Sequence, residues 1–196
     1  MVDAAAALTA LVQARDEATA AHADATVAWC RRITDALGLD IGLTQRVLGC
    51  AALHEIGMIA LPDDVLRGTQ PLTPAQRRAV QLHPIMGADL LAAIPSLASL
   101  APGVRAHHEN YDGSGYPGNL RGSEIPLEAR ILAVADAFHA MISDRPYRAS
   151  MTQRAAMDRL RAGAGSQWDG GIVGTLLDAL SSHRQRAHPI AAPRGA

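Results

Sequence analysis

The most informative stretch of this chain reads His107-His108-Glu109-Asn110-Tyr111-Asp112-Gly113-Ser114-Gly115-Tyr116-Pro117. Two adjacent imidazoles lead into an acidic, glycine-rich loop that ends in Tyr-Pro. Neutral imidazole is the commonest protein ligand for transition metals, and glycine lets a backbone approach a ligand closely. Packing alone does not explain this combination. The stretch therefore predicts a metal site, and other parts of the chain should contribute to it.

Further histidines lie at the ends of apolar segments that are typical of helices. His54 and Glu55 follow the apolar run 47–53, and His83 follows the run 79–82. Ionisable groups in apolar helices are costly unless they are paired or bind a metal. These positions therefore favour the same site.

A carboxylate lies within another apolar segment. Asp136 directly follows the run 131–135, and His139 comes three residues later. Residues spaced by three share one helix face. His22 lies in an alanine-rich segment near the N-terminus and completes the set of six histidines outside the polar C-terminal tail.

Each of these residues, taken alone, also has an ordinary structural interpretation. His22 could be a partly exposed helix residue, and His83 could mark a bend before a proline. Asp136 could pair with Arg130, and residues 54–55 could form an internal ion pair. One shared metal site explains all of these positions at once, so we favour it over separate coincidences.

Composition indicates a helical protein. The chain has 196 residues, 48% of them hydrophobic but only 3% aromatic, so alanine and the aliphatic residues must build the core. The formal net charge of −1 gives no electrostatic basis for binding nucleic acid or an anionic membrane. Cys30 and Cys50 form neither a disulfide framework nor a CxxC site, and they are interpreted as core residues.

Targeting signals are not evident. No apolar run approaches the ~20 residues of a membrane-spanning helix, and the N-terminus lacks the basic region of a secretory signal. A cytoplasmic location is therefore expected. The length fits one domain, which we place at residues 1–182, with a flexible tail at 183–196.

Helix boundaries follow from capping residues and prolines. Gly38 is expected to close the first helix, Thr73-Pro74-Ala75-Gln76 to start another with a capping box, and Thr152 and Asp169 to cap the last two. Pro84 should bend or split its helix. The expected helices cover residues 5–37, 44–56, 74–94, from 102 through the His-His pair, 127–143, 153–163 and 170–180. No segment alternates with period two, so we expect an all-α fold, a single helical bundle with a long loop at 110–126.

Five ordered segments carry a resemblance to a known family. They read His54-Glu55-Ile56-Gly57, His83-Pro84 with Gly87, the stretch 107–117, Ala135-Asp136-Ala137-Phe138, and Ser143-Asp144-Arg145-Pro146-Tyr147-Arg148. Because of these five segments, the chain resembles the HD-GYP family, a branch of the HD superfamily of metal-dependent phosphohydrolases. The resemblance spans residues 20 to 180, and its Gly-Tyr-Pro loop and Ser-Asp-Arg-Pro-Tyr-Arg segment are highly specific together.

The resemblance implies an HD-type helical domain that binds two or three iron or manganese ions and hydrolyses the 3′–5′ phosphodiester of cyclic di-GMP. It also implies that Tyr116 lies near the substrate and that Arg145 and Arg148 reach its phosphates. The metal ligands that it implies are His22, His54, Glu55, His83, His107, His108 and Asp136. Imidazole and carboxylate ligands suit iron or manganese.

Four departures from the family pattern concern the expected site. Glu55 stands where the family has the Asp that bridges two metals, and its extra methylene moves the carboxylate by about 1 Å, which can cost roughly 100-fold in rate. Met58 replaces a lysine and cannot donate a hydrogen bond to phosphate. His139 replaces an acidic residue and is interpreted as a catalytic acid or base, or an extra ligand. Ala18 replaces a Glu of trimetal members, so two metals are expected.

Three hypotheses for function follow. The favoured one is an active cyclic di-GMP phosphodiesterase with an altered site. The alternative is a weak or inactive module that binds a cyclic dinucleotide or docks a signalling protein through its Gly-Tyr-Pro loop. The third is an HD-type hydrolase acting on another phosphoester. The alanine-rich first helix could also support a homodimer, although such a stripe more often faces the core.

Overall fold

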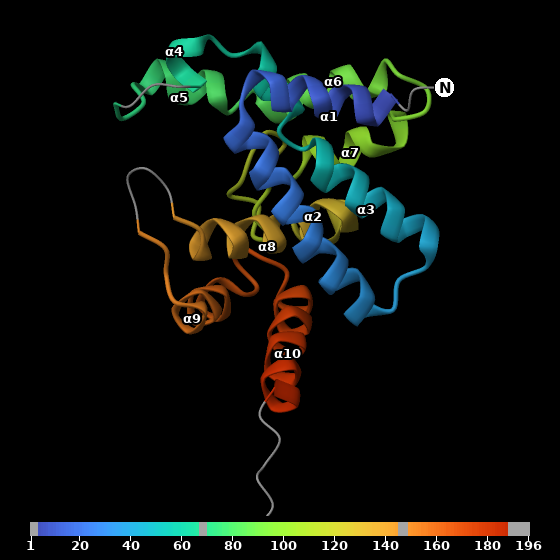
Figure 1. Ribbon diagram of the computed structural model, residues 1–196, viewed down its shortest axis with the longest axis vertical. Coiled ribbons are helices and arrows are strands. Elements are labelled where there is room, and N and C mark those ends of the chain that lie inside the picture. The colour runs from blue at the N-terminus through green and yellow to red at the C-terminus, as the bar shows by residue number, and fades with distance from the viewer. Residues whose placement is uncertain (1–3, 67–69, 145–148, 188–196) are drawn as a thin grey trace, which may run out of the picture.

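The computed structural model describes residues 4–66, 70–144 and 149–187, with side chains described as far as residue 181. These residues form ten α-helices and three short 3₁₀ helices. Their only β-type pairing is an isolated bridge between Ala164 and Trp168. The predicted all-α bundle is confirmed (Figure 1). None of the described helices is both long enough and apolar enough to cross a bilayer.

The N-terminal segment forms two helices, α1 (Ala4–Arg15) and α2 (Glu17–Leu37), where one was predicted. Asp16 causes the break: its backbone is extended, with φ −154°, and its carboxylate accepts a hydrogen bond from the Ala18 N–H at 3.1 Å. This is an N-cap, which starts α2 in a new direction. Gly38 closes α2 in the left-handed region, at φ 64°, as predicted.

Helix α3 (Ile41–Leu53) lies three residues nearer the N-terminus than predicted, because Asp40 caps it by accepting from the Leu43 N–H at 2.9 Å. The 3₁₀ helix η1 (Ile56–Ala60) follows directly after residues 54–55, and a single turn, α4 (Asp63–Leu66), comes next.

The predicted capping box at Thr73 and Gln76 is present and starts α5 (Pro74–Val80). The chain then starts again as α6 (His83–Ala92), with Pro84 in its first turn. Proline is favourable there and unfavourable inside a helix. It therefore splits the predicted helix rather than bending it.

Helix α7 (Ala101–Arg105) follows the 3₁₀ helix η2 (Ala98–Leu100) and ends before the adjacent histidines, which the sequence had placed inside it. The long loop includes the 3₁₀ helix η3 (Gly122–Glu124) and leads to α8 (Leu127–Ile142), close to the predicted range.

Two helices complete the chain, α9 (Gln153–Gly163) and α10 (Gly170–Ala187). Thr152 caps α9 and Asp169 caps α10, accepting from the Gly171 N–H at 2.9 Å, as predicted. Helix α10 continues beyond residue 183, where the sequence had placed the start of a flexible tail.

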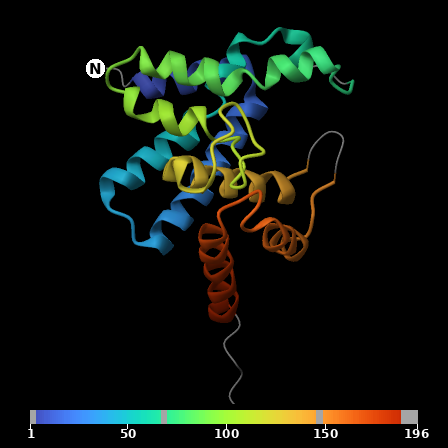
Figure 2. The same ribbon diagram turned by 180° about the vertical axis from the view of Figure 1, so that it is seen from behind.

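Helix α2 lies at the centre of the bundle and packs against α1, α3, α8 and α10. Figure 2 shows the loop between α7 and α8 lying over the middle of the bundle. Buried residues of the central helices form one core, in which the rings of Trp29 and Phe138 meet edge to face at 4.7 Å. Cys30 and Cys50 are free and buried in this core, as predicted.

Candidate metal centre

Three imidazoles are fixed in the same manner, each by the carbonyl three residues earlier in the last turn of a helix. The Nδ1 to oxygen distances are 2.8 Å for His54 with Ala51, 2.7 Å for His83 with Val80, and 2.5 Å for His107 with Val104. Carbonyls in the last turn of a helix lack a partner within the helix. Because a carbonyl only accepts, Nδ1 carries the proton and Nε2 presents its lone pair.

The adjacent histidines are held in their neutral form. Burial lowers the pKa of His107 well below its usual value, and the neighbouring imidazoles add to the effect. Burial, with the nearby His83, lowers the pKa of His108 to about 4. Neutral imidazole is the form that binds metals, so protons compete weakly for these residues at neutral pH.

One group of candidate ligands comprises His83, His107 and His108, whose ligand atoms all lie within 4.8 Å of one another. The Nε2 atoms of His83 and His107 are 3.2 Å apart. Both Nδ1 atoms donate to carbonyls, so two lone pairs face each other across this gap. A cation between them removes the repulsion, which is why this arrangement fits a metal.

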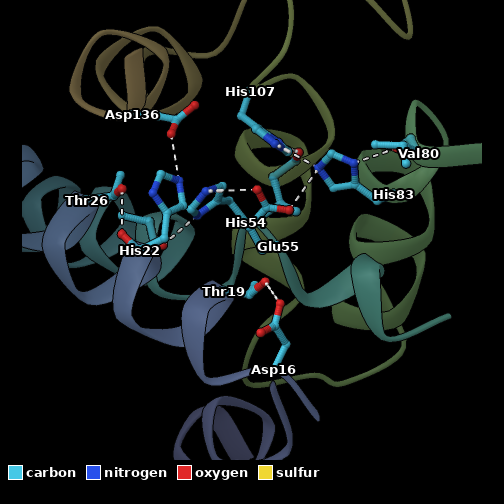
Figure 3. Close-up of polar contacts among 12 residues, drawn as sticks. Asp16, Thr19, His22, Thr26, His54, Glu55, Val80, His83, His107 and Asp136 are labelled. Carbon is cyan, nitrogen blue, oxygen red and sulfur yellow. Dashed lines mark hydrogen bonds and ion pairs between the residues drawn. The ribbon is translucent and has the colours of Figure 1, made fainter. Parts of the chain in front are cut away.

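The second group comprises His22 from α2, His54 from the end of α3 and Asp136 from α8, again within 4.8 Å. Nε2 of His22 lies 2.8 Å from Oδ1 of Asp136 (Figure 3). Burial alone would raise the pKa of Asp136, but the His22 hydrogen bond and the surrounding imidazoles lower it to about 2. The carboxylate is therefore ionised, as a metal ligand must be.

Glu55 lies between the two groups and faces both (Figure 3). Its Oε1 is 3.7 Å from Nε2 of His54, and its Oε2 is 3.5 Å from Nε2 of His83. Oε2 of Glu55 and Nε2 of His54 are buried and make no hydrogen bond. Buried polar atoms without partners are costly, and a bound cation at each group would satisfy both. The donor set therefore fits a pair of metal ions.

Gly57 explains how the His-Glu turn comes so close to His83. A Cβ at this position would lie 2.0 Å from the carbonyl oxygen of His83 and 2.8 Å from the Gly87 nitrogen. Only glycine allows this approach of η1 to α6. Both glycines belong to the segments that the sequence singled out.

An open pocket of about 540 Å³ lies on the His22 side of the centre. It is lined by Ala18, Thr19, Ala21, His22, Glu55, Met58, His139, Ser143 and Asp144. Three of the departures from the family pattern therefore line this one pocket, at Ala18, Met58 and His139. The ring of His139 stacks on His22 with centroids 5.1 Å apart, and its Nδ1 lies 3.1 Å from the Ser143 hydroxyl.

Tyr116 lies against His108 and, among the described residues, is not part of this pocket's lining. The two rings are stacked, with centroids 4.9 Å apart and planes 28° apart. Burial, followed by the charges of Glu55 and Asp136, raises the pKa of Tyr116 to about 12, so its hydroxyl stays protonated. The Tyr116–Pro117 peptide bond is cis.

Sequence reasoning missed Glu109, a buried carboxylate that accepts hydrogen bonds from the Gly118 and Leu120 N–H groups across the loop. Its signal was its place directly after the two histidines. Arg145 and Arg148, predicted to bind phosphates, lie outside the described residues. All the other predicted site residues lie in or beside the centre.

Comparison with known proteins identifies the family to which the chain belongs. A family model described as HD domain matches residues 6–172. The chain is 38% identical over 172 residues to the cyclic di-GMP phosphodiesterase response regulator RpfG of Xanthomonas campestris pv. campestris, covering 87% of this chain and 46% of that protein. It is 32% identical over 169 residues to the 3'3'-cGAMP-specific phosphodiesterase 2 of Vibrio cholerae, covering 85% and 32%. The chain thus spans less than half the length of either relative.

Solved structures share the fold. Bd1817, a HDG"Y"P protein from Bdellovibrio bacteriovorus, matches with a TM-score of 0.65 at 21% identity, over 82% of this chain and 51% of that one. The HD domain of the L. monocytogenes phosphodiesterase PgpH in complex with cyclic-di-AMP matches with a TM-score of 0.65 at 17% identity, over 95% and 99%. The family model and the relatives show that the chain belongs to the HD domain family, in its HD-GYP group.

Proposed function

We propose that this chain is a metal-dependent phosphodiesterase that hydrolyses the 3′–5′ phosphodiester bond of cyclic di-GMP or a related cyclic dinucleotide. The observation that carries the proposal is the pair of buried and half-buried ligand groups, with Glu55 between them, beside an open pocket. The relatives named for cyclic di-GMP and for cGAMP support the substrate class.

Two ions, iron or manganese, would occupy the centre. His83, His107 and His108 would hold one, and His22, His54 and Asp136 the other, with Glu55 bridging them. When bound, such a pair supplies Lewis acidity toward a phosphate group and lowers the pKa of water. Mixed imidazole and carboxylate donors suit these metals better than they suit magnesium.

The substrate phosphate would enter from the pocket, at the His22 group, because His22 and Glu55 are the candidate ligands that line it among the described residues. Asp144, directly before Arg145, lines the same pocket. That position supports Arg145 and Arg148 as phosphate-binding residues, since guanidinium groups bind phosphate oxygens in a bidentate manner. Tyr116 stacks on His108 and is not part of this pocket's lining among the described residues.

His139 would act as a proton carrier. Its imidazole lines the pocket and is oriented by the Ser143 hydroxyl. Hydrolysis adds water across the P–O3′ bond, and the leaving 3′ oxygen needs a proton as that bond breaks. An imidazole at this wall can supply it, and such transfers contribute on the order of 100-fold or more to a rate.

The test is hydrolysis of cyclic di-GMP, 3'3'-cGAMP and cyclic di-AMP with added Mn²⁺ or Fe²⁺, followed by chromatography of the nucleotides. Asp136→Asn should abolish turnover. Asp24→Asn is the matched control, because Asp24 lies on the same helix as His22 but is exposed. No product above a metal-only control with any of the three substrates would refute the proposal, and generic phosphoesters in the same screen would reveal a different hydrolase.

A second candidate function is a weakly active or inactive module that binds a cyclic dinucleotide or a signalling protein. Met58 and His139 favour it, because both line the pocket where the family has a lysine and an acidic residue. Calorimetry of the metal-loaded protein distinguishes the two candidates: binding without turnover supports the module. If neither cyclic di-GMP nor a diguanylate cyclase domain binds, the module has no support.

A further inference from the structure

We propose that Tyr116 is a positioning residue for the metal centre: its ring holds the imidazole of His108, so that the Gly-Tyr-Pro loop completes the His83–His107–His108 group. This rests on the metal pair proposed above. It assigns the loop tyrosine a task other than contact with the substrate.

His108 differs from the three imidazoles fixed by carbonyls. Within the described part of the chain, neither of its ring nitrogens has a hydrogen bond, whereas Nδ1 of His54, His83 and His107 each has one. A metal-binding imidazole normally has its second nitrogen fixed by such a partner. His108 therefore needs another restraint on its ring orientation.

Aromatic contacts supply that restraint. The His108 ring stacks on Tyr116 at 4.9 Å and 28°, meets His107 at 4.1 Å and 41°, and meets His83 edge to face at 5.1 Å and 84°. His107 and His83 are candidate ligands themselves. Tyr116 is thus the one ring contact of His108 among the described residues that comes from outside the ligand set, and offset stacking of this kind is favourable.

The loop holds Tyr116 firmly enough for this task. The Tyr116 N–H donates to the His108 carbonyl at 3.2 Å. Beyond Pro117, the buried Glu109 carboxylate accepts from the Gly118 and Leu120 N–H groups. The backbone is therefore anchored at the tyrosine itself, to His108, and just beyond it, to Glu109.

The pocket supports the same assignment. Its lining includes His22, Glu55 and His139 but not Tyr116, among the residues that the structure describes. The tyrosine ring stacks on His108, a candidate ligand. A ring in that place acts on the substrate through His108.

The test is Mn²⁺ titration of Tyr116→Phe and Tyr116→Leu without substrate, by calorimetry and by electron paramagnetic resonance. Tyr116→Phe keeps the ring and should bind two Mn²⁺ as the unmodified protein does. Tyr116→Leu should weaken one of the two sites by about 10–100-fold, the usual effect of removing a group that orients a ligand. The spectrum of a coupled Mn²⁺ pair should then give way to that of an isolated ion at intermediate Mn²⁺ concentrations.

Tyr111→Leu is the matched control, because Tyr111 lies in the same loop without a ring contact to any described histidine. Circular dichroism checks folding, and Tyr116→Met replaces Tyr116→Leu if that variant does not fold. Full affinity at both sites in Tyr116→Leu, or equal loss in Tyr116→Phe, overturns the assignment. Failure of the proposed function looks different: the unmodified protein would bind two Mn²⁺ but hydrolyse no cyclic dinucleotide.

Discussion

The carboxylate of Glu55 lies 3.5 Å from Nε2 of His83, although Glu55 follows the end of α3 and His83 begins α6. Its other oxygen lies 3.7 Å from Nε2 of the neighbouring His54. The longer side chain of Glu, in place of the Asp usual in the family, therefore reaches both ligand groups at once. The substitution is compatible with a bridging carboxylate.

Shortening this side chain should damage the centre. Glu55→Asp draws the carboxylate back by one methylene, so it can no longer face both groups, and we expect diesterase kcat/KM to fall on the order of 100-fold. Steady-state kinetics with a saturating metal supply measures the effect. Glu17→Asp, an exposed change in the first turn of α2, should leave the rate unchanged. A rise in rate on Glu55→Asp would mean that the centre is still built for Asp.

Restoring a positive charge in the pocket should raise activity. Met58 lines the pocket beside Glu55, and Met58→Lys would place an ammonium group where a phosphate enters. Preorganised donors of this kind contribute on the order of 100-fold, so we expect a gain of at least about tenfold in kcat. Met86→Lys on α6, where Met86 is 40% exposed, controls for added charge. Equal rates for Met58→Lys and the unmodified protein would argue against a phosphate at this wall.

Acid should destabilise the metal-free protein. The pKa of His108 is about 4 in the folded state and about 6.5 in an unfolded chain. Between these values the unfolded state binds more protons, so the free energy of unfolding falls as pH drops from about 6.5 to about 4, by roughly 3 kcal/mol for this residue. Urea unfolding of chelator-treated protein across this range measures it. His108→Asn should flatten the dependence of the free energy of unfolding on pH. If that dependence is unchanged in the variant, other groups cause it and not His108.

Glycine at position 115 should be essential for the loop. A Cβ there would lie 2.2 Å from the Asn110 nitrogen and 2.5 Å from the Glu109 Cα, both backbone atoms. Gly115→Ala must therefore displace the loop, and we expect a loss of about 1–3 kcal/mol, or roughly 3–10 °C in Tm. Gly174→Ala in α10 is the control, since its Cβ would meet nothing within 4 Å. Thermal unfolding by calorimetry compares them, and equal Tm values would contradict the close approach.

Helix ends were predictable wherever a local hydrogen bond sets them. Thr73 with Gln76, Thr152, Asp169 and Gly38 cap helices as the sequence indicated. The break at Asp16 was missed, although an Asp followed by a Glu is a helix start. The surrounding alanine-rich sequence favours an uninterrupted helix, and the turn is stabilised by packing of α1 on α3 and η1.

The candidate ligands could be named from the sequence, because imidazoles and carboxylates in apolar segments are costly without a common purpose. The contacts that each ligand makes in the folded protein could not be predicted from the sequence. The carbonyl partner of each fixed histidine lies three residues earlier, but whether Nε2 then faces another ligand depends on how three separate helices end. The role of Glu109 was hidden for the same reason, since its partners are loop N–H groups placed by the fold.

The sequence by itself determined the candidate ligands of the centre, the all-helical fold and most helix caps, because these depend on residue type and on contacts within one turn. The tertiary structure alone decided that the ligands divide into two groups, that Glu55 lies between them, and that the pocket opens beside His22 while Tyr116 covers His108. Those relations depend on the packing of α2, α3 and α8, and therefore on contacts between residues far apart in the chain.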